Sequence, residues 1–376
     1  MKLATVLIII ILTATAKAEE DNSKCKVHET AVRGNVLDDG PHIYWQNDST
    51  ATVIYYKLGA LLWKSYEVTD TLTFRGFGSH DCEMEYRVLP DPPGPPTSEL
   101  DGVSRYMALS DIHGELDPLI SILRNAGVLD TSGRWAWSDG HLVINGDVFD
   151  RGEEVTECLW FVYRLQQEAA RRGGAVHFLL GNHELMVLRG DLRYINDKYI
   201  KGICGQSGID YDEFFGTCME LGRWLRTLPA AVRIDSTLFV HGGIPPASIM
   251  DLVPIGEMNS LAWSGLDFSS VELKFNQPLR RLYGGLGPFW YRGYHYGIEG
   301  YYPPAEEEEI DRILDYYDVR HIVVGHSEKD SLEILHDGRV FAIDVPVDEL
   351  DGQQALLFEE GTFYRVNSDG SRIEIQ

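Results

Sequence analysis

The chain has 376 residues with a formal net charge of −25, and it contains 44% hydrophobic and 24% charged residues. This composition is typical of a protein with a hydrophobic core, and the length favours one large domain together with a smaller unit. The negative charge argues against binding to nucleic acid or to an anionic membrane surface, because both require a basic face.

The first eighteen residues predict a cleavable signal peptide. Lys2 precedes the apolar run Val6–Leu12, and Ala16-Lys17-Ala18 fits a small-residue cleavage site before Glu19. The apolar run is shorter than the roughly 20 residues that a spanning helix needs. We therefore expect a periplasmic or secreted protein with no stable membrane insertion after cleavage; an uncleaved anchor is the alternative.

Residues 19–88 predict a small β-rich N-terminal domain. Three strand-like runs, His42–Gln46, Thr52–Lys57 and Leu61–Glu67, are separated by short polar or glycine-containing segments. The proline-rich stretch Pro90–Pro96 suits neither a helix nor a strand. We therefore place a linker at residues 89–101 and a large domain at residues 102–376.

The five cysteines include no Cys-x-x-Cys pair, which argues against a zinc ribbon or a thioredoxin-like motif. Export permits disulfide bonds. From their positions in the chain we expect the pairs Cys25–Cys82 and Cys204–Cys218. Cys158 is left over in a predicted helix, where a buried, inert thiol is expected.

Near the end of the chain, the acidic run Glu306–Glu309 follows Pro303-Pro304. Acidic residues are favourable in the first turn of a helix, because they interact with the positive end of its dipole. A helix is therefore expected to start here and to continue to Tyr317.

Beyond the linker, five short apolar runs are each followed by residues that can bind a metal ion. Uninterrupted apolar runs are typical of strands covered on both faces, and ligands gather beyond the carboxyl ends of such strands. The runs are Tyr106–Leu109, Leu142–Asn145, Val176–Leu180, Leu238–Val240 and Ile322–Val324. The polar residues that follow them are Asp111, His113, Asp147, Asn182, His241 and His326.

These residue types suit a centre that holds two divalent ions. Such ions lie about 3.5–4 Å apart and need nitrogen and oxygen donors with a bridging carboxylate. Asp111 and His113 lie two residues apart, so an extended segment points both the same way, and Asp147 is placed to bridge. The second ion would be completed by Asn182, His241 and His326. Because no thiolate is present, manganese, iron and zinc all remain possible.

The motifs around these residues resemble those of the calcineurin-like metallophosphoesterases, in the phosphoprotein phosphatase branch. The resemblance covers residues 104–345 and implies an α/β sandwich of two mixed β-sheets flanked by helices. The signal peptide, Phe149 and Gly287–Gly293 are most similar to the bacterial, Shewanella-like subgroup, which includes a cold-active tyrosine phosphatase with a small N-terminal β domain. The matching stretches are Asp111–Gly114, Gly146–Gly152, Gly181–Glu184, His241–Gly243 and Gly325-His326.

The resemblance implies a role for each of these positions. The first ion would be held by Asp111, His113 and Asp147, and the second by Asp147, Asn182, His241 and His326. It also implies that His183 is the general acid, oriented by Asp150, and that Arg151 is a phosphate clamp with Arg292 as its candidate partner. A hydroxide held by the two ions would be the nucleophile, so no cysteine or serine nucleophile is needed. Ser110 and Glu115 depart from the usual Gly and Gln of the family, but neither is a proposed ligand.

We therefore expect a metal-dependent phosphomonoesterase that acts on phosphorylated protein or peptide, with phosphotyrosine favoured by the resemblance. One alternative is a phosphatase or pyrophosphohydrolase of small molecules such as dinucleoside polyphosphates. Another is an exported metal-binding module without catalysis. The presence of His183, Asp150 and Arg151 argues against that module, because metal binding alone does not require them.

Overall fold

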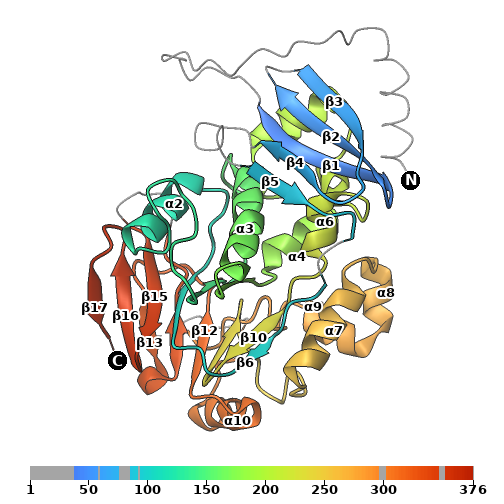
Figure 1. Cartoon of the computed structure of the whole chain (residues 1–376). Helices are drawn as coiled ribbons and strands as arrows, with labels where there is room; N and C mark the ends of the chain where they lie inside the picture. Colours follow the sequence, from blue (N-terminus) through green and yellow to red (C-terminus); the bar gives the residue numbers. More distant parts are fainter. Residues whose placement is uncertain are drawn as a thin grey trace.

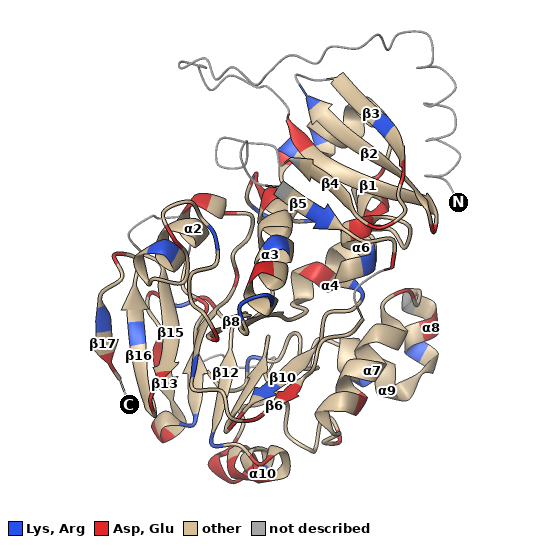
Figure 2. Ribbon diagram, in the orientation of Figure 1, with Lys and Arg blue, Asp and Glu red and all other residues tan. Residues whose placement is uncertain are grey.

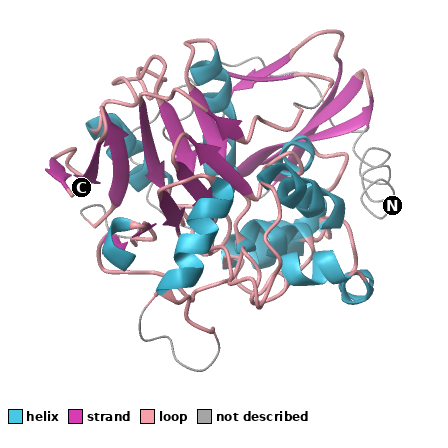
Figure 3. Cartoon of the chain, turned by 90° about the horizontal axis from the view of Figure 1, so that it is seen from below, coloured by secondary structure: helices cyan, strands magenta, loops and turns pink. Residues whose placement is uncertain are grey.

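Two six-stranded mixed β-sheets lie at the centre of the computed structural model, which describes residues 38–57, 60–75, 85–91, 94–295, 302–346 and 352–375. The first sheet has the order β17-β16-β15-β7-β8-β9, and the second has the order β13-β14-β12-β11-β10-β6. In the first sheet, β7, β8 and β9 run parallel. In the second, β11, β12 and β14 do so. Helices flank these strands (Figure 1, Figure 3).

The strands of the first sheet are β7 (Arg105–Leu109), β8 (His141–Ile144), β9 (Ala175–Phe178), β15 (Gln354–Glu359), β16 (Thr362–Asn367) and β17 (Arg372–Glu374). Those of the second are β6 (Glu99–Leu100), β10 (Ala231–Ile234), β11 (Thr237–Val240), β12 (His321–Val324), β13 (Glu333–Leu335) and β14 (Val340–Ala342). The five strands expected before the metal-binding residues are thus β7, β8, β9, β11 and β12. They are divided between two sheets.

Alternation along the strands separates two hydrophobic cores. Tyr106 and Ala108 of β7 pack between the sheets with residues such as Phe239, whereas Met107 and Leu109 face the helices. Both faces of β7 are therefore buried, which explains why its sequence is apolar without interruption.

The helices are α2 (Leu116–Asn125), α3 (Val155–Ala170), α4 (Asn182–Leu188), α5 (Gly205–Ser207), α6 (Glu220–Leu225), α7 (Ile255–Gly265), α8 (Ser270–Phe275), α9 (Gln277–Tyr283) and α10 (Glu307–Tyr317). Shorter helical turns are η1 (Lys198–Cys204), η2 (Tyr211–Phe215) and η3 (His336–Gly338). The acidic start predicted for α10 is confirmed, and Figure 2 shows its concentration of Asp and Glu. Among the described helices, none combines the length and apolar character needed to cross a bilayer.

The expected β-rich N-terminal region is present and packs on α3 and α6 (Figure 1). It contains a three-stranded antiparallel sheet and a separate strand pair. Across the contact, Trp160 Nε1 donates to the carbonyl of Pro41 at 2.8 Å, and the backbone N–H of Trp45 donates to the carbonyl of Cys218 at 2.8 Å. The strands are β1 (Asp39–Asn47), β2 (Thr50–Lys57), β3 (Ala60–Glu67), β4 (Leu72–Arg75) and β5 (Glu85–Val88).

The expected pairing of Cys204 with Cys218 is not formed, because both are free thiols. Cys204 is half-buried at the end of η1, whereas Cys218 is exposed and follows η2 in the chain. The number of residues between the two cysteines did not reveal that one side chain is half-buried and the other exposed. Cys158 is buried in α3, as expected. Cys25, Cys82 and the predicted signal peptide lie outside the described residues.

Glu220 connects the N-terminal sheet to the helices beneath it. Its two carboxylate oxygens accept hydrogen bonds from Trp45 Nε1 at 2.6 Å and from the Tyr163 hydroxyl at 2.8 Å. Both bonds are buried. Removing the carboxylate would leave two buried donors without a partner.

We expect Glu220→Ala to lower the free energy of unfolding by about 2–5 kcal/mol, because an unsatisfied buried donor costs about 1–3 kcal/mol. Urea denaturation measures the change. Glu220→Gln, which still offers one acceptor, should lose less. A loss below about 0.5 kcal/mol for the alanine variant would contradict a structural role for this contact.

Candidate active site

The carboxyl ends of strands from both sheets meet at one edge of the sandwich. Backbone hydrogen bonds hold the segments beyond these ends together: Asp111 N donates to Gly146 O at 3.1 Å, His113 N to Asp147 O at 3.0 Å, and Gly325 N to His241 O at 2.7 Å. These bonds connect loops that are far apart in the sequence, so they place the polar residues after β7 beside those after β8, and those after β12 beside those after β11.

The six predicted metal ligands are brought together in this way. Two groups of donor atoms lie within 4.8 Å of one another, His113/Asp147/His183 and Asp147/His241/His326, and they share Asp147. Asn182 Oδ1 lies 2.9 Å from His241 Nε2, and Asp111 Oδ1 lies 3.9 Å from His113 Nε2. Asp147 therefore occupies the central position that a bridging carboxylate requires.

The hydrogen bonds of the histidines suit metal binding. His113 Nδ1 contacts the carbonyl of Phe149 at 2.7 Å, and His241 Nδ1 contacts that of Asn145 at 2.8 Å. A metal-binding histidine usually donates its other ring N–H to such an acceptor, so both Nε2 atoms can face an ion. The Nε2 atom of His326 is buried without a hydrogen-bond partner. The residues present thus fit a centre of two divalent ions.

Burial and charge oppose each other at this centre. Burial favours the neutral carboxyl of Asp147, but the neighbouring histidines, His241 foremost, hold its pKa well below the usual value. Burial also opposes charge on His241, yet the Asp147 carboxylate raises its pKa. Desolvation lowers the pKa of His113 to about 4, so this imidazole is neutral and able to bind a metal ion at neutral pH.

The backbone is strained at the same place. Six predicted site residues have positive φ angles, which are uncommon for residues with a Cβ atom and cluster at functional sites. They are Asp111 (56°), His113 (49°), Asp147 (57°), Asp150 (71°), Arg151 (64°) and His326 (64°). Gly146 also has a positive φ, of 93°, and a Cβ atom there would lie 2.6 Å from His241 Nδ1. Glycine is therefore required where the β8 loop approaches His241.

Glu184 fixes the loop that carries Asp147. Its buried carboxylate accepts four backbone N–H groups: those of Asp147 and Val148 at 2.8 Å, Phe149 at 3.2 Å and Gly181 at 2.7 Å. Its position after His183 in the sequence left this role undefined. The contacts show that Glu184 joins the start of α4 to the strained turn after β8.

His183 pairs with Asp150 through an Nδ1–Oδ2 contact of 2.5 Å. Burial lowers the pKa of His183, but Asp147 and Asp150 outweigh it, so the pKa is raised above the usual value. Its Nε2 lies 3.9 Å from Asp147 Oδ2. The ring of Tyr194, which is 52% exposed, lies 5.4 Å from that of His183. The sequence analysis did not single out Tyr194, since it follows no strand and belongs to none of the motifs.

The two predicted arginines reach the site from different segments. Arg151 is exposed and its Nη1 lies 3.5 Å from Glu328 Oε2. Arg292 is half-buried and donates from Nη1 to Ser327 Oγ at 3.1 Å, next to His326 in the chain. Within the described residues Arg292 forms no ion pair with a carboxylate.

The aromatic residues near Arg292 are mainly structural. Phe289, Tyr291 and Tyr294 are almost completely buried, whereas Trp290 is partly exposed with its ring 5.7 Å from that of His326. Core packing therefore accounts for the buried three.

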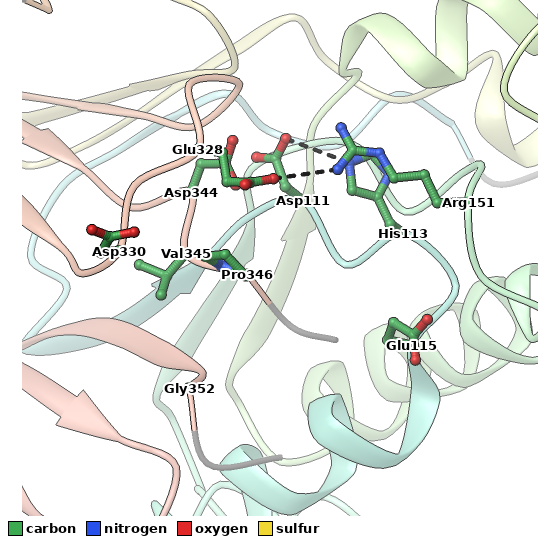
Figure 4. Close-up of a pocket in the computed structure, with 10 residues that line it drawn as sticks. All are labelled: Asp111, His113, Glu115, Arg151, Glu328, Asp330, Asp344, Val345, Pro346 and Gly352. Carbon is green, nitrogen blue, oxygen red and sulfur yellow. Dashed lines mark ion pairs between the residues drawn. The ribbon is translucent and has the colours of Figure 1, made fainter. Parts of the chain in front are cut away.

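A cavity of about 520 Å³ opens beside the predicted ligands (Figure 4). Asp111, His113 and Arg151 line it, together with four acidic residues that were not predicted as ligands: Glu115, Glu328, Asp330 and Asp344. The apolar run before Asp344 is a signal in the sequence that could have revealed it.

Comparison with known proteins agrees with this geometry. Residues 104–329, more than half of the chain, match the calcineurin-like phosphoesterase family. The chain belongs to this family. The resemblance and fold predicted from the sequence are thereby confirmed, and the phosphoesterase family is a family of metal-dependent hydrolases.

Individual relatives and solved structures show which proteins the chain resembles. The chain is 29% identical to Shewanella-like protein phosphatase 1 of Plasmodium berghei over 61% of its own length and 63% of that protein. It is 33% identical to Shewanella-like protein phosphatase 2 of Arabidopsis thaliana over 38% of its own length. The matched region spans only 33% of that second protein. The cold-active protein-tyrosine phosphatase of a psychrophilic Shewanella species superposes with a TM-score of 0.80 at 32% identity, covering 90% of this chain and 99% of that one.

We expect Glu184→Gln to release metal from this phosphoesterase, because an amide nitrogen cannot accept the N–H groups that the carboxylate oxygens accept. Loss of such an outer contact typically weakens metal affinity 10–100-fold. Metal content after dialysis, measured by elemental analysis, tests this. Glu153→Gln, an exposed substitution nearby, should retain its metal; equal retention by Glu184→Gln would refute the assignment.

Proposed function

We propose that the protein is a metal-dependent protein phosphatase that favours phosphotyrosine. The observation that carries the proposal is the His183–Asp150 pair, which lies against the shared ligand Asp147 and close to Arg151. Metal binding alone would not require a buried histidine whose pKa is raised by two carboxylates. The names of the relatives, two protein phosphatases and a protein-tyrosine phosphatase, support a phosphorylated protein as substrate.

The residues divide the chemistry among them. When bound, the two divalent ions would activate water and neutralise charge on the phosphoryl oxygens. Asp111, His113, Asp147, Asn182, His241 and His326 would hold them. Arg151 can exchange Glu328 for two phosphoryl oxygens, because a guanidinium forms bidentate pairs with oxyanions. Asp150 accepts from His183 Nδ1. Because the carboxylates of Asp147 and Asp150 outweigh burial and raise the pKa of His183, the ring can carry a second proton, on Nε2, for the departing oxygen.

Tyr194 favours an aromatic substrate. Its exposed ring lies beside the proposed general acid, where the leaving group must be. A phosphotyrosine ring could pack against it with an aromatic pair energy of about 0.5–1.5 kcal/mol. The acid itself is less necessary for this substrate, because a phenol has a pKa of about 10 and leaves more easily than an aliphatic alkoxide.

Two parts of this proposal depend on the sequence alone. Export to the periplasm or medium depends on the predicted signal peptide at residues 1–18, and nitrogen and oxygen ligands without thiolate suit manganese, iron or zinc. The proposed substrate is a phosphoprotein that is itself exported or that comes from outside the cell.

The proposal predicts metal-dependent release of phosphate from matched phosphotyrosine and phosphoserine peptides, with the tyrosine peptide favoured. EDTA should abolish the reaction and Mn²⁺ should restore it. His183→Ala should lower kcat about 10²–10⁴-fold for phosphoserine, which is the typical contribution of general acid catalysis, and less for phosphotyrosine. Steady-state measurements of phosphate release test the peptide preference, the metal dependence and the effect of His183→Ala.

Two outcomes would contradict the proposal. Hydrolysis of a small aryl phosphate or a dinucleoside polyphosphate, with neither peptide cleaved, would move the substrate to small molecules. No hydrolysis at all by the folded, Mn²⁺-loaded protein would leave a metal-binding module and would refute the enzymatic function.

Tyr194→Ala should lower kcat/KM for the phosphotyrosine peptide about 2–12-fold, the range expected from the loss of one aromatic pair, and should spare the phosphoserine peptide. Tyr194→Phe keeps the ring and serves as the control. An equal loss on both peptides would show that Tyr194 supports the site without selecting the substrate.

A further inference from the structure

Strand β14 ends at the same edge as the strands that carry the predicted metal ligands. It runs parallel to β12, with Val324 paired to Ala342, and the pairing continues in a hydrogen bond from Ile343 N to Val324 O at 2.8 Å. His326 and Asp344 each lie two residues beyond this pair, the first after β12 and the second after β14. The register therefore places Asp344 beside a predicted ligand.

The side chain of Asp344 is buried and faces the cavity. The residue is 6% exposed, and it lines the cavity with Asp111 and His113. Figure 4 shows its carboxylate directed toward the Asp111 and Glu328 side of the cavity. Within the described part of the chain this carboxylate makes no hydrogen bond and no ion pair. A buried carboxylate without a partner is costly, so a cation bound beside it would stabilise its charged form.

The cations near Asp344 are engaged elsewhere. Lys329 donates its backbone N–H to the Asp344 carbonyl, but its Nζ lies 3.5 Å from Glu333 Oε2. Arg151 pairs with Glu328. Burial raises the pKa of Asp344 to about 9, and repulsion from the Asp111 carboxylate adds to this effect. Two neighbouring buried carboxylates of this kind are stabilised when a cation lies between them.

We propose that Asp344 is a further oxygen donor of the metal centre, on the side of Asp111. This inference rests on the proposed function, which supplies the two divalent ions. A third carboxylate beside Asp111 and Asp147 lowers the net positive charge of the loaded centre by one, so the ions are held more tightly. The centre would still be positive and would still attract a phosphate dianion.

The test is the affinity of the metal-stripped, full-length protein for Mn²⁺, measured by titration calorimetry. Asp344→Asn keeps the size of the side chain and removes its charge, and we expect one of the two Mn²⁺ ions to bind at least 10-fold more weakly. Asp330→Asn is the matched control, because Asp330 lines the same cavity but is exposed. Its Mn²⁺ affinity should change less than threefold.

Asp344→Glu gives a second measurement, since it restores the charge on a side chain that is longer by one methylene group. We expect it to bind Mn²⁺ more tightly than Asp344→Asn. The rise in unfolding temperature on adding Mn²⁺ should be largest for the wild type, smaller for Asp344→Glu and smallest for Asp344→Asn, because a ligand stabilises the state that binds it.

Three results would overturn the inference. If the wild type binds two ions and Asp344→Asn binds them with unchanged affinity, Asp344 lies outside the centre and the proposed phosphatase function stands. If Asp330→Asn weakens Mn²⁺ binding as much as Asp344→Asn, the effect comes from the general negative field of the cavity. A wild type that binds no Mn²⁺ would refute the proposed function together with this inference.

Discussion

The position of Asp147 depends on the carboxylate of Glu184. Four backbone N–H groups converge on that carboxylate, three of them from the turn that begins at Asp147. Asp147 has φ of 57° and Asp150 has φ of 71°, so this turn is strained. Strain of about 1–3 kcal/mol per residue persists only where the surroundings over-determine the conformation. Glu184 supplies that constraint from the first turn of α4, which also carries Asn182 and His183. One buried carboxylate thus sets the geometry of the proposed bridging ligand Asp147, the proposed ligand Asn182 and the proposed acid His183.

Four carboxylates at this site differ in behaviour because their neighbours differ. Glu184 faces only donors of the backbone. Asp147 faces histidines, which hold its pKa low, whereas Asp150 contacts the Nδ1 of His183. Asp344 faces the cavity and has no protein partner within the described residues. The chemical group is the same in each, and the number and charge of its neighbours decide whether it supports the backbone, binds a cation or orients a proton donor.

Much of this arrangement could be predicted from the sequence, because the ligands follow strands that are apolar without interruption. The apolar run before Asp344 marks that residue as a candidate, but the register of β12 and β14 could not be predicted, because the pairing of these strands is set only by tertiary structure. The contacts of Glu184 are also invisible in the sequence, because they are made to the backbone. Tyr194 comes close to His183 through the loop after α4, and loop geometry is not encoded in residue spacing. The wrong pairing of Cys204 with Cys218 has a similar origin: distance along the chain does not define which way a side chain points.

The negative charge of the chain gives the cationic groups at the site a further role. Glu115, Glu328 and Asp330 line the cavity, and the whole chain carries a formal charge of −25. A phosphate dianion that approaches this surface is repelled unless positive charge at the site outweighs the negative potential of the surrounding surface. Arg151 cannot provide it alone, because Glu328 already lies 3.5 Å from its guanidinium. Bound metal ions would therefore help to attract the phosphate group as well as to activate it. A phosphate group bound there would compete with Glu328 for the guanidinium of Arg151.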